Sequence, residues 1–82
     1  MIASFKKGFN IEDEIDIEFL FNRIQTARGI RYHVSVVSKW EEFFHFTMVE
    51  KNNSWKIMNP PYQPDWIMQL ENQLSNEIIT RL

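Results

Sequence analysis

Apolar and polar residues alternate on both sides of Asn52-Asn53, and this pattern predicts a β-hairpin over residues 43–58. Asparagine tolerates the positive φ that a tight type I′ turn needs at both central positions. With Lys51 opposite Ser54, one hairpin face is strongly apolar and the other is mixed. The apolar face carries Phe44, Phe46, Met48, Trp55 and Ile57, and the mixed face carries Phe43, His45, Thr47, Val49, Lys56 and Met58.

The pattern over residues 11–28 predicts a helix. Asn10 can cap its start, with Asp13 at the third helical position, and early acidic residues suit the positive end of the helix dipole. Gly29 provides a natural stop. Such a helix would carry one wide apolar stripe, formed by Ile17, Leu20, Phe21, Ile24 and Ala27.

A strand is the alternative for the same segment, because residues 14–19 alternate strictly between acidic and apolar side chains. That alternative gives a four-stranded meander. The capping residues and the polar tail at residues 25–29 favour the helix, so we expect a helix here.

The remaining pattern predicts a strand over Ile30–Ser38, a short loop at residues 39–42, and a proline-stiffened connector at residues 59–64. A last helix begins near Pro64 or Asp65 and runs to the end of the chain, with one apolar stripe of Ile67, Leu70, Leu74, Ile78 and Leu82. The sequence therefore predicts a single α+β domain over residues 1–82: helix, three-stranded antiparallel meander and C-terminal helix, packed as a two-layer sandwich.

Composition narrows the functional classes. The 82-residue chain has no cysteine, which excludes disulfides and thiolate metal sites, and a net charge of −2, which gives no long-range attraction to nucleic acid or anionic lipid. No signal-peptide pattern follows Lys6-Lys7, and no run of 18 apolar residues occurs. We expect a cytoplasmic protein without a membrane partner.

The tetrapeptide Asn59-Pro60-Pro61-Tyr62 follows the last predicted strand and resembles the catalytic motif of methyltransferases that modify amino groups of adenine, cytosine or glutamine. The resemblance implies that Asn59 and Pro60 would accept hydrogen bonds from the target amine while Tyr62 stacks on the target. It also implies a parallel α/β sheet with a glycine-rich loop, whereas the chain has two glycines and is short for such a sheet. Methyltransferase activity is therefore the third hypothesis.

The two histidines, His33 and His45, are predicted to be diagonal neighbours on one sheet face, but no third metal ligand stands at a diagnostic spacing. The acidic residues at 12–18 lack the glycine and closing glutamate of a calcium loop. No nucleophile, base and orienting group form a recognisable set. The sequence thus predicts no metal, no cofactor and no enzymatic activity.

The predicted order of one helix, three strands and one helix is similar to that of the domain that binds double-stranded RNA. The last helix lacks the basic cluster which that domain uses, because no Lys or Arg precedes Arg81 in it. Nucleic-acid binding is the second hypothesis and a less favoured one. It would use the aromatic residues Tyr32, Trp40 and Phe43 with nearby Arg23, Arg28, Arg31 and Lys56.

The leading hypothesis is a non-enzymatic module that binds a protein partner, or a second copy in a homodimer, through the partly apolar sheet face. A large exposed apolar patch on a small domain generally marks such an interface. A rival possibility is that the N-terminal segment, with Ile2, Phe5 and Phe9, folds over this face. The predicted surface consists of Val37, Trp40, Phe43, His45, Val49 and Met58.

Overall fold

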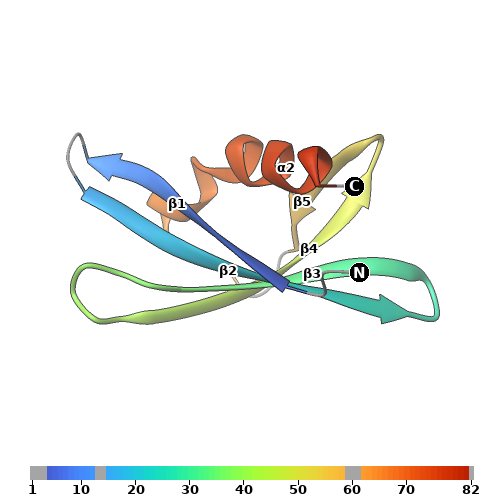
Figure 1. Ribbon diagram of the computed structural model, residues 1–82, viewed down its shortest axis with the longest axis horizontal. Helices are drawn as coiled ribbons and strands as arrows, with labels where there is room; N and C mark the ends of the chain where they lie inside the picture. The colour runs from blue at the N-terminus through green and yellow to red at the C-terminus, as the bar shows by residue number, and fades with distance from the viewer. Residues whose placement is uncertain (1–3, 13–14, 59–61, 82) are drawn as a thin grey trace.

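In the computed structural model, the chain forms a curled five-stranded antiparallel sheet followed by two short helices (Figure 1). The structure describes residues 4–12, 15–58 and 62–81. The strands follow one another in space as they do in sequence. They are β1 (Ser4–Glu12), β2 (Ile15–Thr26), β3 (Gly29–Val37), β4 (Phe43–Lys51) and β5 (Ser54–Ile57), and the helices are α1 (Asp65–Met68) and α2 (Glu71–Thr80).

The predicted fold class is wrong in its first half, because no helix precedes the sheet and the sheet has five strands instead of three. Residues 15–26 form β2, so the strand alternative is correct for this segment, and β1 adds a strand that neither alternative includes. A helix over 11–28 would place apolar side chains on nearly every side. The strand instead buries Ile17, Phe19 and Phe21 on one face and leaves Asp16 and Glu18 exposed.

Gly29 does not stop a helix, as was predicted, but begins β3 after a tight turn. The chain turns tightly at Ala27-Arg28, with Thr26 opposite Gly29, and Gly29 adopts a φ of 114° that favours glycine. The Thr26 hydroxyl donates to the Gly29 carbonyl at 2.7 Å and accepts from the Arg28 amide at 3.2 Å. The features that resemble a helix end therefore build a hairpin turn.

The predicted hairpin over residues 43–58 is confirmed in its turn and its register. Asn52 and Asn53 have φ values of 55° and 67°, and Met48 lies opposite Ile57. The Met58 amide donates to the Thr47 carbonyl at 2.8 Å, which extends the same register by one residue. Its apolar face lies in the core: Phe46, Met48, Trp55 and Ile57 are buried and Phe44 is half-buried.

The core lies between one face of the sheet and the helices (Figure 1). The predicted stripe of the last helix is buried at Ile67, Leu70, Leu74 and Ile78, while Leu82 lies outside the described residues. The helix is interrupted at Gln69-Leu70 and so forms two pieces rather than one. Trp66 from α1 touches Phe19 of β2 and Phe44 of β4 with its ring edge-on, at centroid distances of 6.3 and 5.8 Å.

Candidate interaction surface

The face of the sheet turned away from the helices carries the predicted surface residues, and we call it the open face. Val37 and Phe43 lie opposite each other on β3 and β4 and are 53% and 63% exposed. Met58 is 39% exposed, His45 is exposed and Val49 is half-buried on the same face. Trp40, in the loop between β3 and β4, is 64% exposed. The structure thus brings these residues to one side or to its rim.

The N-terminal segment does not cover the open face within the described residues. Phe5 and Phe9 are on β1, where they face the core: Phe5 stacks on Phe21 with centroids 4.6 Å apart, and Phe9 meets Phe19 edge-on at 5.4 Å. Ile2 lies outside the described residues. The described part of β1 therefore extends the sheet sideways, and the rival arrangement, in which this segment lies over Phe43 and Met58, does not occur there.

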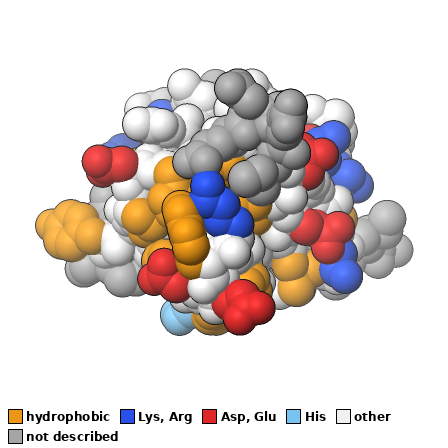
Figure 2. Space-filling view, turned by 90° about the vertical axis from the view of Figure 1, so that its left-hand side faces the viewer, with side chains coloured by type: hydrophobic (Ala, Val, Ile, Leu, Met, Phe, Trp, Pro, Cys, Tyr) orange, Lys and Arg blue, Asp and Glu red, His pale blue; other side chains and the backbone are white. Residues whose placement is uncertain are grey.

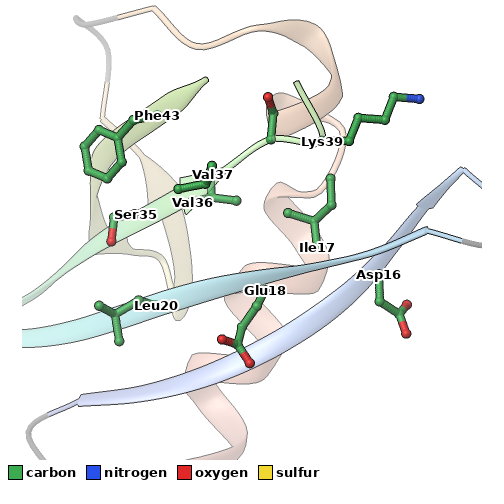
Figure 3. Close-up of a pocket in the computed structure, with 10 residues that line it drawn as sticks. Asp16, Ile17, Glu18, Leu20, Ser35, Val36, Val37, Lys39 and Phe43 are labelled. Carbon is green, nitrogen blue, oxygen red and sulfur yellow. The ribbon is translucent and has the colours of Figure 1, made fainter. Parts of the chain in front are cut away.

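A cleft opens where the sheet divides into two hairpins. Residues 19–26 of β2 pair with β3, whereas residues 16–18 pair with β1 alone, so the β1–β2 and β3–β4 hairpins separate at this end (Figure 1). The cleft has a volume of about 460 Å³ (Figure 3). Its lining includes Asp16, Glu18, Leu20, Val37, Lys39 and Phe43.

The cleft combines an apolar floor with an acidic side. Leu20, Val37 and Phe43 supply apolar surface, while Asp16 and Glu18 project from β2 (Figure 3). The Glu18 carboxylate lies 3.9 Å from the Lys6 ammonium, an exposed pair that contributes little to stability. A ligand that buries apolar surface against this floor and carries a positive group toward β2 would complement the cleft.

The loop that borders the cleft is held in a defined shape by Ser38. Its buried hydroxyl accepts hydrogen bonds from the amides of Trp40 and Glu42, both at 3.2 Å, and its amide donates to the Glu42 carbonyl at 2.8 Å. Glu41 adopts a φ of 64°, a left-handed conformation that reverses the chain. This shape leaves Trp40 exposed to solvent. The Lys39 ammonium lies over the Trp40 ring, 4.5 Å from the ring centroid.

Charged side chains interrupt the apolar surface. Figure 2 shows the end of the molecule where the two hairpins separate, and hydrophobic side chains reach the surface there in groups divided by acidic and basic ones. Such a mixed surface is typical of an interface with a polar rim rather than of a buried subunit contact. No helix in the described chain is both long and apolar enough to cross a membrane.

The two histidines lie together on the open face, as predicted, with Ser35 opposite His45 and ring centroids of His33 and His45 5.5 Å apart. The Phe43 ring lies 5.6 Å from that of His45. No group of three metal-ligating side chains exists among residues 4–12, 15–58 and 62–81. His33 and His45 place polar groups within the apolar surface of the open face.

The remaining sequence hypotheses gain little from the fold. Asn59, Pro60 and Pro61 lie outside the described residues, Tyr62 is 84% exposed, and the antiparallel sheet differs from the parallel sheet that the methyltransferase resemblance implies. The similarity to the order of elements in the RNA-binding domain is lost with the first helix. Tyr32, a proposed stacking residue for nucleic acid, is 3% exposed in the core.

Sequence reasoning missed the contribution of β2 to the site. Asp16, Glu18 and Leu20 line the cleft, and Ile24, which is 40% exposed, lies on the same face further along β2. The strict alternation over residues 14–19 was the sequence signal for a strand that carries these acidic residues on one face.

Comparison with known proteins adds no relative, since no family model, curated protein or solved structure matches the chain.

Proposed function

We propose that the protein is a non-enzymatic interaction module, and that it binds an extended segment of a partner protein in the cleft and on the adjoining open face. The observation that carries this proposal is the uncovered apolar floor formed by Leu20, Val37 and Phe43. Val37 and Phe43 are more than half exposed and lie opposite each other, and adjoining apolar side chains, unlike single scattered ones, support an interaction surface.

The charges of the cleft specify the chemistry of the partner. Two carboxylates, those of Asp16 and Glu18, stand beside the apolar floor against one ammonium, that of Lys39, so the bound segment carries an aromatic or aliphatic side chain with a Lys or Arg close to it. Such contacts at a solvent-exposed rim weaken as salt increases. The mixed character of the surface suits a reversible complex with ordered water at its rim.

A random-sequence peptide display library tests the proposal, because it offers the cleft every kind of side chain at once. We expect enriched peptides to pair an apolar residue with a basic one, and Phe43→Ser to weaken their binding at least about fivefold, since truncating a central apolar contact costs more than about 1 kcal/mol. Glu18→Gln should weaken binding at low salt and have less effect at high salt.

Ile79→Ser is the matched control, because Ile79 is an apolar residue on α2 with 43% exposure and lies outside the cleft. This substitution should leave peptide binding unchanged. Equal binding to the wild type and to Phe43→Ser would refute the proposal, as would enriched peptides without basic residues whose binding ignores Glu18→Gln.

A further inference from the structure

The two edges of the sheet differ in how their backbone groups are satisfied. At the β5 edge, the Trp55 amide donates to the Ser75 hydroxyl at 2.9 Å, and the Ile57 amide donates to a Glu71 carboxylate oxygen at 2.8 Å. Both acceptors are side chains of α2. The helix α2 thus covers the β5 edge and prevents another strand from pairing with β5.

The β1 edge has no comparable cover. Thr26 and Gly29 are partners on either side of the two-residue turn at residues 27–28. Residues that flank a two-residue hairpin turn form a hydrogen-bonded pair, and such pairs recur at every second residue of an antiparallel ladder. Counting back through β2 places the amide and carbonyl groups of Phe5 and Lys7 toward β2. Those of Ser4, Lys6 and Gly8 consequently point away from the sheet.

These outward groups are accessible. Gly8 has no side chain and is exposed, so its exposed surface is backbone. Among the residues that the structure describes, none forms a backbone hydrogen bond with the outer side of Ser4, Lys6 or Gly8. An edge strand of nine residues with open backbone groups is a template for another strand.

We propose that a second copy of the chain pairs with this edge, β1 against β1 in antiparallel orientation, about a two-fold axis at Gly8. A two-fold axis at Lys6 or Lys7 would set like charges directly opposite each other, which is unfavourable. An axis at Phe9 would leave only residues 8–10 of each copy to pair before the irregularity between Asn10 and Glu12. The Gly8 axis sets no like charges opposite each other, leaves residues 6–10 to pair regularly, and brings the two backbones together where no side chain intervenes.

This register brings side chains together on each face. On the core side, Lys7 lies opposite Phe9 of the second copy, and Phe5 meets Ile11 at the irregular end of the ladder, so apolar groups meet across the junction. On the open face, Lys6 lies opposite Asn10 of the second copy. The β2 neighbour of that Asn10 is Asp16, so a basic residue of one copy approaches an acidic residue of the other.

The product is a continuous ten-stranded sheet in which both open faces point the same way, so a partner would meet two clefts side by side. The pairing itself does not depend on the proposed function. Its interface is a single pair of strands, so the dimer is weak, and we expect the average mass to rise from monomer toward dimer between about 10 µM and 1 mM. Sedimentation equilibrium measures this directly.

Amide hydrogen exchange resolves which edge is used. In the dimer, the outward amides of Lys6 and Gly8 should exchange more slowly at high protein concentration, while the amides of Phe5 and Lys7, already bonded to β2, should not change. An unchanged exchange rate for Lys6 and Gly8 across the concentrations at which the mass increases would overturn the proposal.

Charged side chains introduced at Gly8 test the position of the two-fold axis. A Cβ at this position would lie 4.0 Å from the Asp16 Cβ, which is ordinary contact, so a side chain fits. Gly8→Asp sets two carboxylates opposite each other and should keep the protein monomeric, whereas Gly8→Ala, the control, should change the dissociation constant less than about threefold. A mixture of Gly8→Asp and Gly8→Lys should form a heterodimer.

The outcomes separate this proposal from the proposed function. A wild type that stays monomeric at 1 mM refutes the β1 pairing, as does a Gly8→Asp variant that dimerises like the wild type. A dimer lost in Phe43→Ser but retained in Gly8→Asp would place self-association on the open face and also refute it. Circular dichroism of each variant confirms that the sheet is intact. Peptide binding by the wild type, measured at concentrations well below those at which the mass increases, tests the cleft independently.

Discussion

The hydroxyl of Ser75 is expected to contribute substantially to stability although it belongs to a small polar side chain on a helix. It is 5% exposed and accepts the outward amide of Trp55 at 2.9 Å. In Ser75→Ala the Trp55 amide stays in place, covered by α2, and loses its acceptor. The change thus leaves a buried donor unsatisfied, which is more costly than removing both partners of a hydrogen bond.

The expected size follows from two opposing terms. An unsatisfied buried amide costs about 1 to 3 kcal/mol. Alanine is a better helix former than serine, and this recovers about 0.5 kcal/mol in α2. Thr80→Ala gains a similar helix preference and removes a hydroxyl that donates to the Asn76 carbonyl on the exposed side of the same helix. Ser75→Ala should therefore be about 1 to 3 kcal/mol less stable than Thr80→Ala.

Urea unfolding followed by tryptophan fluorescence measures the difference, with the slope of the transition compared between variants. For a domain of this size each kcal/mol also lowers the melting temperature by roughly 4 to 8 °C. If Ser75→Ala unfolds at the same urea concentration as Thr80→Ala, the Trp55 amide does not depend on α2 for its hydrogen bond. The account of the β5 edge as covered by the helix would then be wrong.

Other substitutions probe the core and the loop. Phe19→Ala should lower the unfolding free energy by about 3 to 5 kcal/mol, measured in urea, because Phe19 is fully buried between Phe9 and Trp66. Trp55→Phe should cost less than about 1.5 kcal/mol, since the loss of ring volume is partly offset by removal of an indole N–H that is buried without a partner among the described residues; a loss as large as that of Phe19→Ala would contradict this. Glu41→Gly should raise the melting temperature by a few degrees by relieving a left-handed conformation, whereas a decrease would show that Glu41 is not strained.

The parts of the fold that could be predicted from sequence are those where local rules agree. In residues 43–58, turn chemistry, alternation and residue type all indicate one hairpin, and its register is correct to the residue. The apolar stripe of the last helix was also identified, although its interruption at Gln69-Leu70 carries no Gly or Pro that would mark it. The open-face positions of Phe43 and His45 followed from the hairpin alone.

Residues 4–28 could not be assigned because local signals there disagree. Asn10, Asp13 and Gly29 are suited to helix ends, while the alternation from Glu14 to Phe19 is suited to a strand. The deciding contacts are distant in sequence: Phe19 and Phe21 lie opposite Val36 and Val34 of β3. The acidic half of the cleft was missed for the same reason. In a helix over residues 11–28, Asp16 and Glu18 would not belong to the sheet at all.

The helix α2 packs on the core and also covers the β5 edge of the sheet. Its position explains which surfaces of the molecule remain uncovered. On one side α2 buries Leu74 and Ile78, and its Ser75 and Glu71 meet the backbone of β5. A helix lying along β5 cannot cover the outer backbone groups of β1 in the same way, and it lies on the opposite side of the sheet from Val37 and Phe43. The two surfaces left over carry different charge, because the β1 edge has Lys6 and Lys7 while the cleft has Asp16 and Glu18. Asp16 is shared, because it lines the cleft and Lys6 of a second copy approaches it. Strand pairing at β1 should therefore leave peptide binding in the cleft possible and weaken it only slightly.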